Sequence, residues 1–229
     1  MSDPQRKRIG IFSYGRIKSQ RCPNKMLRPF GNTCLAEILF KKLHVFGSDA
    51  FFAGYEPEFM QLAASAGVRF IQRSENSVSI DGPISEVLSF LEPLDYDYFL
   101  IINGCLPFLK VSTIQSFLRF IQDVEYRSCS AVSPVQNYFF QQDGAPINFD
   151  LRLKTLNTKA VAPILAFANA LYFFRKDYFL KNGRYWDWNT VKLFRISDPI
   201  ELLDVDTETD FQIAHALWND GTIGEPWNQ

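Results

Sequence analysis

The sequence has little of what several common kinds of active site require. It contains only two histidines, His44 and His215, and both lie in segments with a helical pattern, where a single histidine is more often a packing or surface residue. This argues against nucleophilic catalysis centred on histidine and against histidine-rich metal sites. Four scattered cysteines form no Cys-x-x-Cys pair, so we expect reduced structural thiols: Cys22, Cys34, Cys105 and Cys129.

Net charge and long apolar runs are also missing. The 24 Lys and Arg residues nearly balance the 25 Asp and Glu residues, which argues against a general nucleic-acid or membrane surface and makes any anion site local. No apolar stretch approaches the length of a membrane span. The polar start, MSDPQRKR, lacks the apolar core of a signal peptide. We therefore expect a soluble cytoplasmic protein that binds neither nucleic acid nor membrane.

Short apolar runs alternate along the chain with longer amphipathic stretches, as strands alternating with helices do. We expect strands at residues 8–14, 49–55, 68–73, 96–103 and 129–135, and a further strand followed by a helix start at 164–180. We expect helices at 33–45 (capped by Thr33), 57–67, 84–91, 111–124 and 207–220. This order predicts one domain, residues 1–229, with a three-layer α/β/α architecture and a mainly parallel, Rossmann-like sheet.

Residues 136–165 interrupt this order with aromatic side chains, an Asp-Gly turn and no sustained period. They fit an inserted hairpin and lid, or an arm used in dimerisation. Exposed aromatic clusters usually mark interfaces, so the NYFF and RYWDW segments are expected to pack in a core or in a dimer contact.

The stretch GRIKSQRCPNKML, residues 15–27, follows the first expected strand and is rich in cations: Arg16, Lys18, Arg21 and Lys25. It has neither the Walker nor the dinucleotide-binding glycine spacing. It is either a clamp for several phosphates or an ordinary solvated loop, and composition alone does not separate the two. Ligands of such sheets bind where the carboxyl ends of the strands converge, here with the Asn103 loop and residues 79–85.

A second feature lies far away in the sequence. Asp204 and Asp206 stand two residues apart in DVD, at the end of an apolar run, so in an extended segment both carboxylates share one face and can bind one hard cation. Alternatively, Asp206 caps the following helix and Asp204 is solvated. A cationic clamp with a carboxylate pair is the minimum needed for Mg²⁺-assisted displacement at a nucleotide phosphate.

Both stretches resemble one known family. IFSYGRIKSQRCPNK is similar to the signature loop of the CMP-sialic acid and CMP-KDO synthetases, approximately I-P-A-R-x-x-S-x-R-x-P-x-K, and IELLDVDTETDFQIA resembles their I-D-I-D-T-x-x-D-F element. The match is looser at IINGCLPFLKVSTI and FANALYFFRK. These matches imply the nucleotide-diphospho-sugar transferase fold and transfer of CMP from CTP to an acidic 2-keto sugar, most closely a sialic-acid-like nonulosonate, with release of pyrophosphate.

The resemblance also implies roles for individual residues. Arg16, Arg21 and Lys25 would hold the triphosphate with the Ser19 hydroxyl, and Asp204 and Asp206 would hold Mg²⁺. Arg16, Lys25 and Asp206 would be the catalytic residues. Asn103 stands where the family has Gln and would read the base edge. Arg73 and Ser85 would border the nucleotide and the sugar. A homodimer is expected by resemblance alone.

This sequence departs from the family in or near the loops: Tyr14 and Gly15 replace the Pro-Ala of the motif, and Lys18, Met26 and Cys105 also differ. Cys105 replaces an Asp that the KDO branch has next to its metal, which argues against the usual KDO arrangement. The departures leave open a divergent relative that acts on a KDO-like sugar or a phosphonate, or a non-catalytic nucleotide-binding module.

Overall fold

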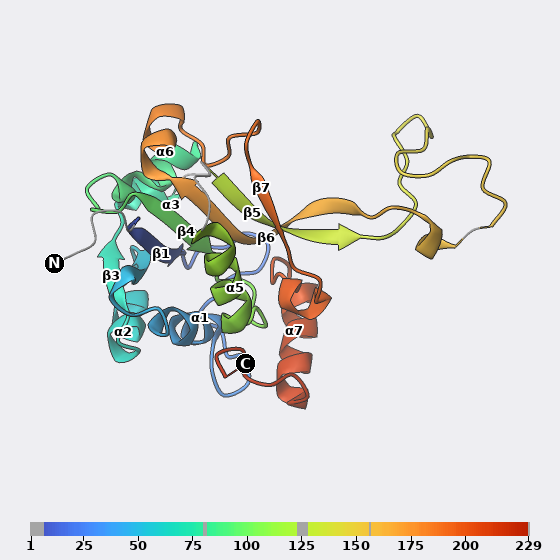
Figure 1. The fold of residues 1–229 in the computed structure, drawn as a ribbon. Helices are drawn as coiled ribbons and strands as arrows, with labels where there is room; N and C mark the ends of the chain where they lie inside the picture. The colour runs from blue at the N-terminus through green and yellow to red at the C-terminus, as the bar shows by residue number, and fades with distance from the viewer. Residues whose placement is uncertain (1–6, 80–81, 123–127, 156, 229) are drawn as a thin grey trace.

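The computed structural model describes residues 7–79, 82–122, 128–155 and 157–228. In that part of the chain a seven-stranded sheet has the order β3-β2-β1-β4-β6-β5-β7 (Figure 1). The strands are β1 Ile9–Tyr14, β2 Ala50–Gly54, β3 Arg69–Gln72, β4 Tyr98–Ile102, β5 Ser128–Val135, β6 Ile164–Arg175 and β7 Lys192–Arg195.

The sheet is mainly parallel, as expected. β1 pairs in parallel with β2 and β4, β2 with β3, and β5 with β7. β6 is antiparallel to both of its neighbours, β4 and β5, because the chain leaves β5 through a long hairpin and returns along it. From β1 the chain winds outward to β2 and β3 and then returns to β4 on the other side of β1, which places the topological switch point between β1 and β4.

Helices cover both faces of the sheet (Figure 1). Their bounds are α1 Leu35–His44, α2 Pro57–Ser65, α3 Glu75–Ser79, α4 Ile84–Val87, α5 Val111–Gln122, α6 Lys176–Asn182 and α7 Glu208–Asp220. Short 3₁₀ turns lie at Gly47–Asp49, Ser89–Leu91, Thr158–Ala160 and Pro199–Leu202. None of the described helices combines the length and apolar character that crossing a bilayer requires.

Alternating strand residues supply two hydrophobic cores, one on each face. Ile11 and Leu100 pack with α1 and α5, whereas Phe12 and Phe99 pack toward α4 and α6. The Phe12 ring stacks on Phe51 with a centroid distance of 5.2 Å. All five residues of β4 are buried, which explains their continuous apolar pattern.

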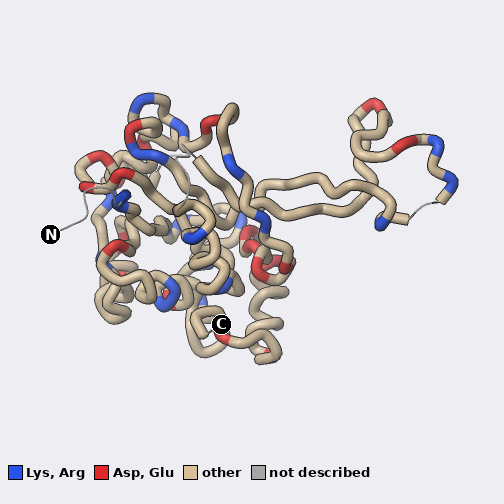
Figure 2. The backbone as a smooth tube through the Cα atoms, in the orientation of Figure 1, with Lys and Arg blue, Asp and Glu red and all other residues tan. Residues whose placement is uncertain are grey.

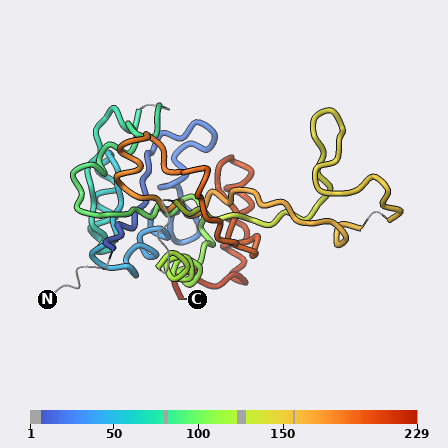
Figure 3. The backbone as a smooth tube through the Cα atoms, turned by 45° about the horizontal axis from the view of Figure 1, so that its top comes forward, coloured from blue at the N-terminus to red at the C-terminus, as the bar shows by residue number. Residues whose placement is uncertain are grey.

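The 136–165 segment is the far part of an arm that projects from the body (Figures 1 and 3). β5 and β6 pair as far as Val135 and Ile164, and the intervening residues form the end of the arm. β5, the arm and β6 thus form one long hairpin, and the use of the arm as a lid or in dimerisation stays a prediction. Figure 2 shows that both basic and acidic residues lie in the arm.

The element boundaries differ from prediction at a few places. The first helix begins at Leu35 with Cys34 at the N-cap, so the prediction that Thr33 caps it is wrong. The Thr33 hydroxyl instead donates to the Glu37 carboxylate at 2.7 Å. The expected helix at 111–124 ends at Gln122, and its last two residues lie outside the described part. β7 is an edge strand of four residues that the sequence pattern did not indicate.

Candidate active site

A cavity of about 650 Å³, the main cavity, opens at the carboxyl ends of β1 and β4. Tyr14 and Gly15 follow β1, and Asn103 and Gly104 follow β4, so the cavity lies at the topological switch point, where open α/β sheets bind ligands. One wall of the cavity is basic, because Arg73 and several residues of the 15–27 loop line it. The lining residues of this loop are Arg16, Lys18, Ser19, Gln20, Arg21, Lys25 and Met26. The structure thus brings both motifs of the sequence to one cavity.

The basic loop is attached to the acidic segment at residues 204–206. The Lys25 ammonium donates to the Val205 carbonyl oxygen at 2.6 Å and to Asp206 Oδ1 at 3.1 Å. The Arg21 guanidinium lies 2.9 Å from Asp206 Oδ2. Burial lowers the pKa of Lys25, but the neighbouring Cys105 and Asp206 side chains raise it more, so the net shift is upward. Lys25 is therefore a permanent cation of the cavity wall.

The alternative that Asp206 caps α7 is wrong. The cap is Thr207, whose hydroxyl accepts a hydrogen bond from the Asp210 amide at 3.2 Å, while the Asp210 carboxylate accepts one from the Thr207 amide at 2.7 Å. This capping box leaves both oxygens of Asp206 facing the two cations.

Asp204 lies behind Asp206 and is held by Asn103. The Asn103 side-chain amide donates to Asp204 Oδ2 at 3.2 Å and to the Asn169 carbonyl oxygen at 2.7 Å, and its own oxygen accepts the Cys105 amide at 2.9 Å. Both amide protons are therefore in use, which favours a role in orienting Asp204 over the predicted reading of a base edge.

Asp204 is the carboxylate most in need of a positive partner. Its Oδ1 is buried and has no hydrogen-bond partner among the described residues. Burial, with Asp206 close by, raises the pKa of Asp204 to about 6. A divalent cation would satisfy the unpaired oxygen and return the carboxylate to its charged form.

The donor set of this pair fits magnesium rather than a softer metal. The described residues contain no group of three or more His, Cys, Asp or Glu side chains suited to a metal. Two carboxylates are enough for Mg²⁺, which usually takes its other ligands from water and substrate phosphates. Burial raises the pKa of the neighbouring Cys105 thiol to about 11, so this side chain is a neutral group and not a thiolate ligand.

Arg73 lines the cavity, but its guanidinium donates hydrogen bonds to other groups of the protein. It bonds to the Ser77 hydroxyl at 3.2 Å and to the Val87 carbonyl oxygen at 3.2 Å, and it also bonds to the Ser77 carbonyl oxygen. It reaches the Gly15 carbonyl oxygen at 3.4 Å. Arg73 therefore fastens Ser77 and Val87 to the end of β1 and shapes the cavity.

The other predicted site residues take different positions. The Arg16 guanidinium donates to the Val78 carbonyl oxygen at 3.1 Å, and the Ser19 hydroxyl accepts the Cys22 amide at 3.4 Å; both residues line the main cavity. Ser85 is exposed and lies outside the cavity wall, next to Gly183, whereas Ile84 and Val87 line it.

Sequence reasoning missed Glu56, which supports the basic loop from α2. Its Oε1 accepts the Ile17 amide at 2.8 Å, and its Oε2 is buried without a hydrogen-bond partner in the described part of the chain. A lone glutamate before Pro57 carries no sequence signal for this role.

A second cavity of about 260 Å³ adjoins the main one and shares Tyr14, Asn103 and Gly104 with it. Its other walls are Ser13, Ile101, Ile102, Tyr172 and Tyr185. The Tyr172 hydroxyl donates to Asn169 Oδ1 at 3.0 Å. The site thus offers a charged compartment beside one with aromatic and amide walls.

Comparisons with known proteins agree with this geometry. A family model described as cytidylyltransferase matches residues 14–218. No curated protein matches the chain by sequence. Among solved structures, a CMP:2-keto-3-deoxy-manno-octonic acid synthetase complexed with CTP has a TM-score of 0.67 at 12% identity, covering 93% of this chain and 99% of that one.

Two further structures share the fold. A cytidylyltransferase from Leptospira borgpetersenii serovar Hardjo-bovis (strain JB197) has a TM-score of 0.60 at 15% identity, covering 94% of this chain and 88% of its own. A 4-diphosphocytidyl-2C-methyl-D-erythritol synthase from Anaerococcus prevotii DSM 20548 has a TM-score of 0.60 at 10% identity, covering 93% and 96%. Fold and site define a nucleotidyltransferase. The chain belongs to the cytidylyltransferase family and is a CTP-dependent enzyme.

Proposed function

We propose that this cytidylyltransferase transfers CMP from CTP to an acidic 2-keto sugar, with a sialic-acid-like nonulosonate as the first acceptor to test. The observation that carries the proposal is the contact of Lys25 and Arg21 with Asp206 in the wall of one cavity. It joins the basic loop and the acidic segment, the two motifs that resemble the CMP-sugar synthetases. The fold neighbour named as a CMP:2-keto-3-deoxy-manno-octonic acid synthetase supports the acceptor class.

In this proposal the triphosphate of CTP lies against the basic loop. Arg16, Arg21 and Lys25 bind its oxygens and the Ser19 hydroxyl contributes a further hydrogen bond, while Arg73 holds the wall beside the nucleotide. Fixed cations in a partly buried cavity stabilise negative charge that grows on the leaving group. The cations of the clamp therefore both position the α-phosphate and favour the departure of pyrophosphate.

Asp204 and Asp206 would hold Mg²⁺, which supplies charge neutralisation and a fixed orientation for the nucleotide phosphates. Asn103 keeps Asp204 in position through the 3.2 Å hydrogen bond. The acceptor occupies the second cavity, from which its hydroxyl oxygen reaches the α-phosphorus. A new oxygen–phosphorus bond forms as the bond to the bridging oxygen of pyrophosphate breaks, and the hydroxyl proton leaves to water.

A pyrophosphate-release assay tests the proposal. The purified protein is incubated with CTP, Mg²⁺ and a panel of nonulosonic and octulosonic acids, with a methylerythritol phosphate and a phosphonate as acceptors outside the class. We expect turnover with at least one sugar acid and none without acceptor. Turnover only with the phosphate or phosphonate would overturn the proposed acceptor class.

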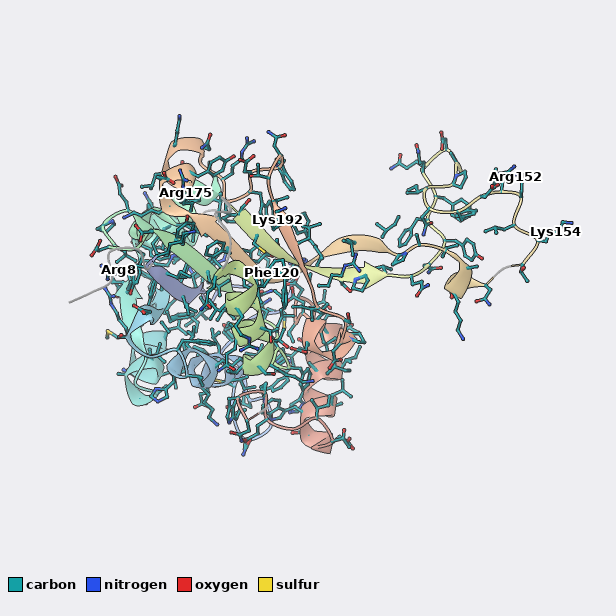
Figure 4. The ribbon with its side chains drawn as sticks, in the orientation of Figure 1. Arg8, Phe120, Arg152, Lys154, Arg175 and Lys192 are labelled. Atoms are coloured by element: carbon teal, nitrogen blue, oxygen red, sulfur yellow. The ribbon has the colours of Figure 1, made fainter. Side chains whose placement is uncertain are left out.

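The arm is proposed to form a homodimer. Several large apolar side chains on it are exposed: Phe140 at 56%, Ile147 at 53% and Leu151 at 73%. Arg152 and Lys154 lie at its far end (Figure 4). An apolar surface this far from the body gains stability when a second copy covers it.

A further inference from the structure

The proposed acceptor is an acid, but the second cavity offers it no positive partner. Among the described residues that line this cavity none is Lys, Arg or His: Ser13, Tyr14, Ile101, Ile102, Asn103, Gly104, Tyr172 and Tyr185. A carboxylate that left water for such a wall would lose its hydration without gaining an opposite charge. The hydroxyl and amide groups of the wall instead suit the uncharged, hydroxyl-bearing part of a sugar.

The tyrosines of the second cavity show that this environment disfavours negative charge. Burial raises the pKa of Tyr14, Tyr172 and Tyr185, because each phenolate would be poorly solvated there. On the side of Asn103, the neighbouring Asp204 would also repel another carboxylate. The carboxylate of an acceptor in this cavity must therefore extend out of it on the side of Tyr14.

The main cavity begins on that side, because Tyr14 lines both cavities. Most of the described cations in its wall already bond to oxygen atoms of the protein: Arg16, Arg21, Lys25 and Arg73. Lys18 lines the same cavity, is exposed, and forms no hydrogen bond or ion pair with another described residue. Lys18 can therefore take an anionic partner without breaking an existing contact.

Lys18 also lies close to the second cavity along the chain. It follows Tyr14 by four positions, a distance of at most about 14 Å between the two Cα atoms. Its ammonium sits on a flexible four-carbon stem and can turn toward a ligand in either cavity. An acceptor that projects past Tyr14 into the main cavity can therefore contact Lys18 through a charge-assisted hydrogen bond.

We propose that Lys18 binds the carboxylate of the acidic acceptor and is the residue by which the enzyme selects an acid over an uncharged sugar. This inference rests on the proposed function, because it requires an acidic acceptor in the second cavity. The sequence departs from the family's loop at Lys18, so the resemblance does not imply this role.

A cycle that combines one protein change with one ligand change isolates the contact. Initial rates with CTP and Mg²⁺ are measured for the wild type, Lys18→Ala and Lys181→Ala, with the best sugar acid of the acceptor panel and with its carboxamide. Lys181 is the matched control, because it is an exposed lysine on α6 that lines neither cavity. Any effect of the amide on the reactivity of the acceptor is common to all three proteins and cancels.

We expect Lys18→Ala to raise KM for the sugar acid about tenfold, since one lost pairing of about 1.4 kcal/mol is tenfold in affinity. The value of kcat should change little, because the carboxylate is bound equally in the ground state and the transition state. KM for the carboxamide and for CTP should change less than about threefold. The preference for acid over amide should thus fall about tenfold in Lys18→Ala and persist in Lys181→Ala. An unchanged preference in Lys18→Ala would overturn the inference.

Two further comparisons keep the result decisive. Lys18→Arg retains the positive charge and should retain most of the preference for the acid, and Lys18→Gln replaces the Ala variant if circular dichroism shows that the latter is unfolded. A rise in KM for CTP with the preference intact would assign Lys18 to the triphosphate and contradict the inference. Failure of the wild type to turn over any sugar acid would instead overturn the proposed function.

Discussion

The ammonium nitrogen of Lys42 lies 2.7 Å from the carbonyl oxygen of Leu106, inside the protein. A second hydrogen bond reaches the Pro107 carbonyl oxygen at 2.9 Å. The buried Glu201 provides the opposing charge and also accepts the Lys110 amide at 2.9 Å. These contacts fix the loop after β4, whose Cys105 carbonyl oxygen accepts the amide of Val205, the residue between the two aspartates.

Lys42 should make stability depend on pH in an unusual direction. Burial lowers its pKa to about 7 from 10.5, so between these values the unfolded chain binds a proton that the folded chain does not. The free energy of unfolding of the wild type, relative to Lys42→Met, should rise with pH above 7 with a slope of at most about 1.4 kcal/mol per pH unit. Urea denaturation of both proteins from pH 6.5 to 9 measures it. Parallel pH curves would contradict the prediction.

Asp204 should have the opposite dependence. Its pKa is raised from 3.8 to about 6, so the wild type loses stability as pH rises through this window and stays less stable above it. Asp204→Asn should be more stable than the wild type at pH 7 without Mg²⁺ by about 1–2 kcal/mol, allowing for solvent screening, and equal to it near pH 4. Thermal unfolding at both pH values tests this. Added Mg²⁺ should stabilise the wild type but not the variant.

Lys25→Met should remove a fixed cation from the proposed clamp. We expect kcat/KM for CTP to fall by about 10²–10³, the usual loss for one preorganised donor to a charged transition state. The control is Lys41→Met, because Lys41 lies on α1 against the Trp227 ring, at 4.4 Å from its centroid, and does not line the main cavity. A similar loss in both variants would show that the effect is structural.

Thr207→Ala separates helix capping from the carboxylates beside it. Loss of the hydrogen bond from the Asp210 amide should lower the free energy of unfolding by about 1 kcal/mol. Affinity for Mg²⁺-CTP should change less than about threefold, because Thr207 does not line the main cavity. Chemical denaturation and calorimetry give the two values. A large loss of affinity without a loss of stability would reverse the assignment.

The arm should be separable from the body. Val135 and Ile164 are directly paired, so an Asn-Gly turn can replace residues 136–163 as a two-residue hairpin loop. The melting temperature of the shortened protein should lie within a few degrees of that of the full chain. The shortened protein should elute as a monomer, whereas the full chain should elute as a dimer. Light scattering coupled to gel filtration measures both masses. A full chain that is monomeric at micromolar concentration would contradict the dimer proposal.

The sequence was most informative where a segment's residue types reflect both its place in the fold and its chemical role. The basic loop and the DVD segment were predicted to serve one phosphate chemistry, and the structure brings Lys25 and Asp206 to 3.1 Å. β4 was predicted as a buried strand because an unbroken apolar run has few other uses in an α/β fold.

The remaining features depend on tertiary context. Lys41 and Lys42 are identical neighbours in the sequence, yet one stacks on Trp227 and the other is buried, because they occupy different faces of α1. β7 has only four residues, too few for the alternating pattern of a strand to be recognised. It forms because its backbone pairs with β5. Asn103 was expected to read a base edge. Its hydrogen bond to Asp204 depends on the position of a residue about 100 positions away, which the sequence does not reveal.

The contact between Lys25 and Val205 also has a consequence for the order in which the site forms during synthesis of the chain. The two residues are 180 positions apart, so at about 5–20 residues per second the ribosome makes Val205 roughly 10–35 s after Lys25. During that interval the nascent basic loop has no Asp206 beside it. The basic wall of the cavity is therefore complete only after the acidic segment has been synthesised and docked.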